Sequence, residues 1–335
     1  MLSRKLSHLC SILTAVFLLC VSTAALSDPK QVVFIRYKIA PTYFQTVVDS
    51  FKDAMTLRGY VEGRDINYID IITSTADRAS VPEVIAAVNK YKKSADMFIT
   101  SGWISMYARK ELKGTDVPQL FVPVLHSVAL KMVKDTESEP GTNISGVYLM
   151  YPPEKILRIS KFIIPSIERY AYVYDSNIPA DIIFKSAYES LSVKDRHGID
   201  IHYIDLAQGV DKVLEQLNEH GIEAYGGIVG SFKNRKQLAE SNIPVITSFT
   251  LDIDEQSIKQ YVENDNTVAG LFNSFGYCGS LAAEMTADIF DGKKTIQQTI
   301  PRNSKQIAFL NLKGARKLNL PISFDVLEAV DLIVK

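Results

Sequence analysis

Small, hydroxylic and aromatic side chains are the residues of this chain whose types and positions could do chemistry. Ser101, Gly102 and Trp103 form the clearest group, because they stand between a buried apolar run and a predicted helix. In an open parallel sheet, ligands bind at the carboxyl ends of strands, where loops and helix N-termini gather. Backbone N–H groups, hydroxyls and ring faces there suit an uncharged or zwitterionic small molecule. The candidate ligand-binding residues chosen in this way are Tyr37, Ser101, Gly102, Trp103, Pro123, His126, Asp175, Ser176, Asn177, Ser231, Phe232, Thr247, Phe249, Asn273 and Phe275.

Several of these residues also have purely structural interpretations. Ser101 and the glycine after it are typical of a helix cap. Trp103 is either a core residue or a wall of a cleft, and the preceding glycine favours the wall. Asp175 could cap a helix or pair with a ligand ammonium group. Side chains such as Tyr37 and Phe275 more often belong to the core of a domain.

The enzyme and metal signatures that were sought in the sequence are incomplete. Residues 276–280, Gly-Tyr-Cys-Gly-Ser, are similar to a nucleophile elbow, but Ser280 stands where the second glycine is required. The five histidines have no metal-ligand spacing, and residues 292–295 lack the upstream glycine of a phosphate-binding loop. We therefore expect a non-enzymatic protein without cofactor or metal, in which Cys278 packs a helix. An enzyme acting through Cys278 is the weaker alternative.

Apolar and amphipathic runs that would position these residues alternate along the chain. Strands are expected at 32–37, 65–72, 96–101, 119–124, 144–149, 169–174, 200–205, 224–229, 244–248, 267–273 and 306–311. Helices are expected at 42–58, 81–93, 105–112, 153–163, 182–193, 209–220, 234–241 and 277–291. Strands separated by helices imply right-handed βαβ crossovers and parallel sheets, so the fold class is α/β.

The length of the chain, 335 residues, predicts two domains rather than one. We expect a first α/β lobe at 28–148, a second at 149–275, and a crossover segment at 276–335 that is split between them. The run 139–148, Glu-Pro-Gly-Thr-Asn-Ile-Ser-Gly-Val-Tyr, lies at the first crossover and has the residues of a tight turn. A chain that crosses more than once between two lobes makes a hinge.

The N-terminal segment, 1–27, has the order of a secretory signal peptide. Arg4 and Lys5 precede an apolar run, and small residues follow it up to Ala25. We expect cleavage and a periplasmic protein. The alternatives are an uncleaved anchor and a lipoprotein held through Cys20, although Leu19 stands where that signal needs a small residue.

The mature chain is expected to be mildly acidic. The formal charge is −1, and cleavage removes two positive charges and no carboxylate. A surface for nucleic acid needs clustered Lys and Arg, so we expect no nucleic-acid partner. No apolar run after residue 27 is long enough to span a membrane.

Five motifs in order resemble one known family. Residues 139–147 are similar to its "rPGgNvTGv" signature, and residues 311–322 to its closing "NlktAkaLGltiP". Similar stretches are 96–110 with its strand, glycine and helix, 117–118 with its "IPvvf" motif, and 279–289 with its "GrqaaeMAvriL" helix. The chain thus resembles the ABC transporter substrate-binding family that includes tryptophan-binding lipoproteins.

This resemblance implies a type I periplasmic binding protein. Two Rossmann-like lobes joined by a hinge would close on a small ligand in a cleft and deliver it to an ABC permease in the inner membrane. Members with assigned ligands favour aromatic amino acids. Gly102 matches the family's glycine after the third strand, residues 175–177 match its loop after the second lobe's first strand, and Phe275 stands at an aromatic position.

The chain also departs from the family pattern near the expected cleft. Trp103 replaces a small hydroxylic residue, and His126-Ser127 replaces a frequent Asp-Pro pair. The stretch 253–265 is longer and more charged than usual. Trp103 could fill space that an aromatic ligand would otherwise occupy, so the ligand could differ. A periplasmic sensor that docks on a membrane receptor is the alternative to a transport protein.

Overall fold

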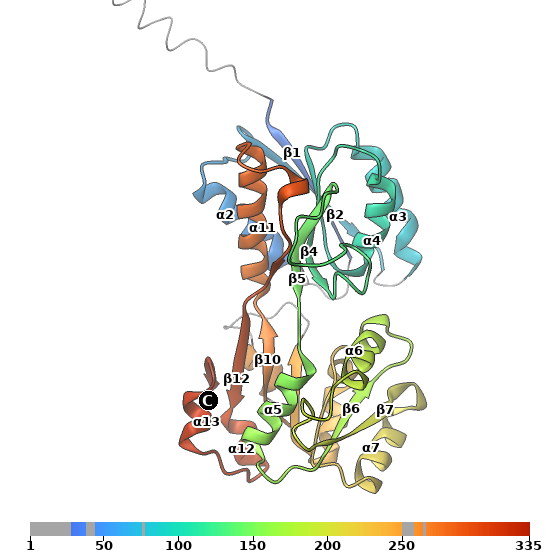
Figure 1. Ribbon diagram of the computed structural model, residues 1–335, viewed down its shortest axis with the longest axis vertical. Helices are drawn as coiled ribbons and strands as arrows, with labels where there is room; N and C mark the ends of the chain where they lie inside the picture. The colour runs from blue at the N-terminus through green and yellow to red at the C-terminus, as the bar shows by residue number, and fades with distance from the viewer. Residues whose placement is uncertain (1–27, 38–43, 76–77, 250–257, 264–265) are drawn as a thin grey trace, which may run out of the picture.

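The computed structural model describes residues 28–37, 44–75, 78–249, 258–263 and 266–335, which form two α/β lobes (Figure 1). The first lobe contains a six-stranded sheet with the order β11-β5-β4-β3-β1-β2, in which every pairing is parallel. Its strands are β1 (Lys30–Tyr37), β2 (Ile66–Thr73), β3 (Met97–Thr100), β4 (Gln119–Leu125), β5 (Ile144–Leu149) and β11 (Arg302–Asn303).

Alternating side chains of β1 build the two apolar layers of the first lobe. Val32 and Phe34 point to one face, and Val33 and Ile35 point to the other, as the two-residue period of a strand requires. Both sets are buried, which explains why the strand is one continuous apolar run. The first face is covered by α2 (Gln45–Leu57) and α11 (Phe275–Phe290), and the second by α3 (Val81–Tyr91) and α4 (Ser105–Leu112).

Helices α2 and α11 lie side by side in the first lobe although more than two hundred residues separate them (Figure 1). Gly279 allows this close packing, because a Cβ there would lie 2.3 Å from the carbonyl oxygen of Val47. Cys278 is fully buried in α11, as the sequence predicts.

The second lobe contains a seven-stranded sheet with the order β13-β12-β10-β9-β8-β6-β7. Its strands are β6 (Arg169–Tyr174), β7 (Asp200–Asp205), β8 (Ala224–Gly226), β9 (Val245–Phe249), β10 (Thr267–Asn273), β12 (Gln306–Asn311) and β13 (Leu332–Val334). Its helices include α5 (Pro153–Ile163), α6 (Pro179–Glu189), α7 (Val210–Glu219), α8 (Gly230–Lys233), α9 (Arg235–Leu238), α10 (Ile258–Val262), α12 (Leu312–Lys317) and α13 (Phe324–Glu328).

Alternating side chains of β6 build two apolar layers in the second lobe, as those of β1 do in the first. Tyr170 and Tyr172 pack toward α5 and α6, while Ala171 and Val173 pack toward α7 and α9. The large side chains fill the first layer with stacked rings, since Tyr188 of α6 lies 4.7 Å from Tyr172 between ring centroids.

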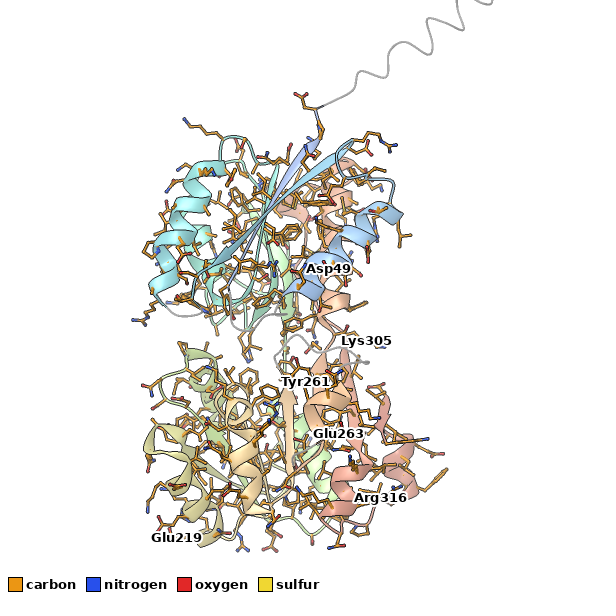
Figure 2. All side chains as sticks on the ribbon, turned by 180° about the vertical axis from the view of Figure 1, so that it is seen from behind. Asp49, Glu219, Tyr261, Glu263, Lys305 and Arg316 are labelled. Carbon is orange, nitrogen blue, oxygen red and sulfur yellow. The ribbon has the colours of Figure 1, made fainter. Side chains whose placement is uncertain are left out.

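Three segments connect the lobes. The chain passes from β5 to α5, returns from β10 to α11, and passes again from β11 to β12, and these connections lie side by side (Figure 1). Asn273 at the end of β10 ties two of them together, because its Nδ2 donates to the carbonyl oxygens of Ser304 and Lys305, at 3.0 and 3.1 Å. Ser304 N donates to Tyr148 O at 3.0 Å, which links the third connection to the first. Figure 2 shows Lys305 at this waist.

The prediction of two α/β lobes with largely parallel sheets is confirmed, and the structure corrects several details. β10 and β12 are antiparallel, because β10 leads into the first lobe whereas β12 leads back out of it. The helix expected at 182–193 begins at Pro179 and ends at Glu189. The strand expected at 224–229 ends at Gly226. The helix expected at 234–241 is divided into α9 and a 3₁₀ turn at Ala239–Ser241, and the short helix α8 precedes it. Within the described ranges, no helix is both long and apolar enough to cross a membrane.

Candidate functional site

Three predicted site residues form an aromatic row together with Phe44 at the carboxyl end of β1, and we define this row as Tyr37, Phe44, Trp103 and Phe275. The ring of Tyr37 lies 6.1 Å from that of Trp103 and 5.1 Å from that of Phe44, measured between centroids. Phe44 in turn stacks on Phe275 at 5.7 Å. Tyr37 and Trp103 are half-buried, while Phe44 and Phe275 are buried. The row therefore offers ring surface at Tyr37 and Trp103 and rests on the other two rings.

Gly102 sets the position of Tyr37 in this row. Its φ is +63°, and a Cβ would lie 2.5 Å from Tyr37 Cε1, so a larger residue would be strained and would displace the tyrosine ring. Ser101 beside it does not cap the following helix through its side chain. Its Oγ instead donates to the carbonyl oxygen of Val122 at 2.7 Å, next to the buried Pro123. Ser101 and Pro123 thus have buried, structural positions next to the aromatic row.

His126 connects the first lobe to the second. It follows β4, and its ring lies 4.6 Å from the ring of Phe184 in α6, between centroids. Its Nε2 is buried and finds no hydrogen-bond partner among the described residues, and burial lowers the pKa of its imidazole below 6.5. His126 therefore favours the neutral form in this contact. Any hinge motion that separates the lobes has to change it.

The second group lies in the β6 loop, which we define as Asp175, Ser176 and Asn177. Asp175 does not cap α6, whose N-cap is Ile178. Its Oδ1 accepts a hydrogen bond from Asn177 N at 2.9 Å, so the loop folds around this carboxylate. Ser176 and Asn177 are exposed, and Asp175 is half-buried. All three side chains are therefore available at the surface of the second lobe.

Asp181 in the first turn of α6 joins the β6 loop to the start of α8. It is fully buried, and its carboxylate accepts hydrogen bonds from the backbone N–H groups of Asp175, Val229 and Gly230. Burial raises the pKa of Asp181, and these three donors act against that rise. This brings the β6 loop next to Ser231, another predicted site residue.

Ser231, Phe232 and Thr247 line a small pocket of about 20 Å³ in the second lobe. Such a volume holds about one water molecule, so it is too small for a metabolite. Thr247 also holds the chain after β8, because its hydroxyl accepts from Gly227 N at 3.0 Å. All three side chains are buried. They support the loops of the second lobe in this structure.

The two remaining predicted residues are Phe249 and Asn273, and the structure describes the side chain of Asn273 alone. Phe249 ends β9, and its side chain lies outside the described residues. Asn273 is fully buried at the waist, where its Nδ2 binds the backbone of the third connection. Asn273 Oδ1 has no partner among the described residues. Asn273 thus lies among the three connections between the lobes, where a hinge is expected.

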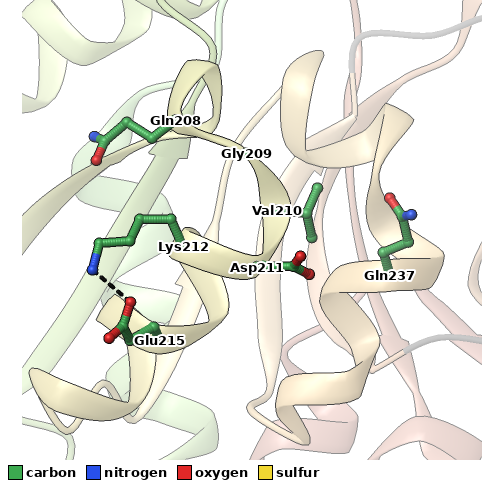
Figure 3. A pocket seen from close by; sticks show the side chains of 7 residues that line it. All are labelled: Gln208, Gly209, Val210, Asp211, Lys212, Glu215 and Gln237. Atoms are coloured by element: carbon green, nitrogen blue, oxygen red, sulfur yellow. Dashed lines mark hydrogen bonds and ion pairs between the residues drawn. The ribbon is translucent and has the colours of Figure 1, made fainter.

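A larger groove of about 560 Å³ lies elsewhere on the second lobe (Figure 3). It is lined by Gln208, Gly209, Val210, Asp211, Lys212, Glu215 and Gln237. No predicted site residue lines it, and Lys212 pairs with Glu215 across its surface. The charges of this groove are thus at least partly paired with each other.

Four residues of the candidate site were not identified from the sequence. Phe44 and Phe184 look like ordinary core residues of amphipathic helices. Asp181 lies just before the helix that was expected to begin at 182, so it was assigned to a loop. Pro179 was the available signal, because proline is favoured at the first helical position and would have placed Asp181 in the first turn. Asp205, which accepts from Ser176 N at 3.0 Å, ends a predicted strand without any motif.

The geometry of these groups suits binding and offers little for catalysis. Ring faces and carboxylates come from the loops after strands of both sheets, and Cys278 is buried in α11. Within the described residues, no group of three or more His, Cys, Asp or Glu side chains could hold a metal ion.

Comparison with solved structures shows the same fold in proteins of low sequence identity. The ABC domain in complex with L-Trp from Streptococcus pneumonia has a TM-score of 0.75 and 15% identity, over 92% of this chain and 100% of that one. A ligand-free, open substrate binding protein with adhesive properties from Clostridium difficile has a TM-score of 0.72 and 17% identity, over 91% and 99%. A conserved domain protein from Vibrio cholerae O1 biovar El Tor has a TM-score of 0.72 and 17% identity, over 91% and 100%. The lobes thus have the type I periplasmic binding protein fold.

The sequence was also compared with curated proteins and with family models. No curated protein matches it. The family model described as ABC transporter substrate binding protein matches residues 41–333, which is most of the chain. The chain therefore belongs to the ABC transporter substrate binding protein family, whose members capture a small ligand and are not enzymes.

Proposed function

We propose that this chain captures an aromatic amino acid, or a related small metabolite, between its lobes and delivers it to an ABC permease of the inner membrane. The aromatic row is the observation that carries this proposal. Tyr37 and Trp103 present partly exposed rings at the carboxyl end of β1, 6.1 Å apart between centroids. Phe44 supports Tyr37 at 5.1 Å and itself stacks on Phe275 at 5.7 Å. Offset or edge-to-face packing against such rings favours an aromatic ligand.

The β6 loop supplies a complementary group for the polar part of such a ligand. The Asp175 carboxylate is half-buried and accepts one backbone hydrogen bond through Oδ1. A carboxylate in this position can also accept a charge-assisted hydrogen bond from an ammonium group. The L-Trp in the similar Streptococcus structure supports the same ligand class.

The proposed place of action is the periplasm, reached by cleavage of a signal peptide at residues 1–27. These residues lie outside the described part of the structure. Their order of basic, apolar and small residues supports cleavage over a lipid anchor at Cys20.

A thermal-shift panel on residues 28–335 tests the ligand class. L-Trp, L-Tyr and L-Phe are compared with L-Ala, L-Lys, L-Glu and ribose at equal concentrations. A ligand that binds only the native state at about a hundred times its Kd adds ~2.7 kcal/mol to the free energy of unfolding, so the melting temperature rises. We expect this rise with at least one aromatic amino acid. A rise with ribose or an aliphatic amino acid alone would contradict the proposed ligand class.

A further inference from the structure

We propose that Asp181 is a positioning residue for ligand binding, whose buried carboxylate fixes the two loops that form the second lobe's part of the site. This inference rests on the proposed function, because it takes the β6 loop as a ligand-contacting segment. Asp181 Oδ2 accepts from Asp175 N at 3.0 Å and from Gly230 N at 2.9 Å. Asp181 Oδ1 accepts from Val229 N at 2.9 Å. One side chain thus holds the chain after β6 and the chain after β8.

The complete burial of the Asp181 side chain is the reason to assign it a positioning role. A carboxylate with no exposed area is unfavourable unless hydrogen bonds compensate for the lost water, and here three backbone donors do so. Tyr172 Oη also donates to the backbone oxygen of Asp181 at 3.2 Å, which fixes the first turn of α6 against β6. The side chain is therefore held from both its own helix and the loops it joins.

The two loops approach so closely that only glycine fits between them. A Cβ on Gly230 would lie 2.7 Å from Asp181 Oδ2 and 2.8 Å from Asp175 Cβ. Gly230 does not need glycine for its backbone angles, because it lies in α8 with no positive φ. Close contact with the two aspartates is therefore the structural reason for this glycine.

Carboxylates hold each successive N–H group of the β6 loop. Asp181 accepts from Asp175 N, Asp205 accepts from Ser176 N at 3.0 Å, and Asp175 accepts from Asn177 N. These backbone donors are engaged within the protein. A ligand at this loop therefore meets its side chains, and Asp181 acts on the ligand by setting where those side chains point.

The test compares Asp181→Asn with Asp96→Asn in the full mature chain. Asparagine has the shape of aspartate but replaces one acceptor oxygen with an N–H₂ group, which faces backbone donors. Asp96 is the control, because its Oδ2 also accepts from a backbone N–H group, that of Gln31 at 2.8 Å, at the amino end of β3 and away from the ligand edge. It differs from Asp181 in being half-buried and in pairing through Oδ1 with Lys30 Nζ at 2.9 Å. Two readouts are used: hydrogen exchange of backbone amides without ligand, and calorimetric titration with L-Trp, L-Tyr and L-Phe.

We expect the amides of Asp175, Val229 and Gly230 to exchange about tenfold faster or more in Asp181→Asn than in the wild type. In Asp96→Asn these amides are expected to exchange at the wild-type rate. We expect affinity for the aromatic amino acid that binds to fall by a similar factor, as the loss of hydrogen bonds to a charged group predicts. Asp96→Asn is expected to bind as the wild type does. Unchanged exchange in Asp181→Asn would overturn the inference, and so would faster exchange with unchanged affinity.

The outcomes separate this inference from the proposed function. If the wild type binds none of the three amino acids, the proposed ligand class fails, and the exchange rates still decide whether Asp181 fixes the loops. If Asp181→Asn does not fold, Gly230→Ala replaces it, because its added Cβ crowds Asp181 Oδ2 and Asp175 Cβ and so pushes the loops apart, while the side chain of residue 181 stays a carboxylate. Gly230→Ala is expected to weaken binding, and wild-type affinity in this variant would overturn the inference.

Discussion

Trp103 shows how one side chain can serve both the core and the site. Its ring packs on Tyr37 and, edge to face, on Tyr107 of α4 at 5.8 Å between centroids, yet the residue is only half-buried. The choice between core residue and cleft wall, which the sequence leaves open, is therefore not a strict alternative. The ring thus packs within the first lobe and keeps part of its surface exposed.

We predict that Trp103→Ala weakens binding of the aromatic ligand by about tenfold or more, as for a residue that dominates an interface. The loss of unfolding free energy is expected to be about 1–3 kcal/mol, below the ~3–5 kcal/mol typical of a fully buried tryptophan. Tyr91→Ala is the control, because Tyr91 is half-buried in the same apolar layer at the end of α3. Chemical denaturation and calorimetric titration give both quantities. Wild-type affinity together with a loss above about 4 kcal/mol would make Trp103 a core residue only.

Sequence reasoning at this scale succeeds where the end of a strand decides the place of a residue. Tyr37, Trp103 and Asp175 were predicted because they follow strands, and the structure places each at the end of one. Asp181 and Phe184 could not be found in this way, because contacts between distant segments determine their roles. Whether the predicted residues bind the ligand stays a prediction.

Asn273 acts between elements, since it joins the end of β10 to the chain that enters β12. Asn311 makes the same arrangement inside the second lobe, where its Nδ2 donates to the carbonyl oxygens of Val262 and Thr267 at 3.1 and 2.8 Å. Both asparagines are buried at the end of a strand. Asn273 binds a segment that connects the two lobes, whereas Asn311 binds only segments of the second lobe, so Asn311 serves as the matched comparison.

We predict that Asn273→Ala and Asn311→Ala each cost about 1–3 kcal/mol of unfolding free energy, because buried carbonyl groups lose their donor. Only Asn273→Ala is expected to raise hydrogen exchange in residues 303–306 of the ligand-free protein. Because the exchange is measured without ligand, a change in these residues cannot come from a lost contact between Asn273 and the ligand. Equal exchange in residues 303–306 in both variants would show that Asn273 does not hold the hinge.

Helices and strands were predictable from the sequence where their apolar residues recur with the period of a helix or a strand. The helices at 105–112 and 153–163 have the predicted bounds, because an amphipathic stripe begins and ends with them. The direction of β12 was not predictable, since it depends on where the chain re-enters the second sheet. The short strand β11 has only two residues and shows no period at all.

At the scale of the whole molecule, we propose that the three connections act as a hinge about which the lobes move as units. The contact of His126 with Phe184 joins the lobes, as do the hydrogen bonds at the waist. A ligand can shift the equilibrium toward a closed arrangement only by its differential affinity for that arrangement. The aromatic row in one lobe and the β6 loop in the other supply this difference if one ligand contacts both.

Small-angle X-ray scattering on residues 28–335, with and without a saturating amino acid from the thermal-shift panel, tests this account most directly. We predict that the radius of gyration decreases when the ligand binds, because the lobes close on it. L-Ala or another compound without stabilising effect serves as the control. An unchanged radius of gyration at saturation would contradict capture of the ligand by lobe closure.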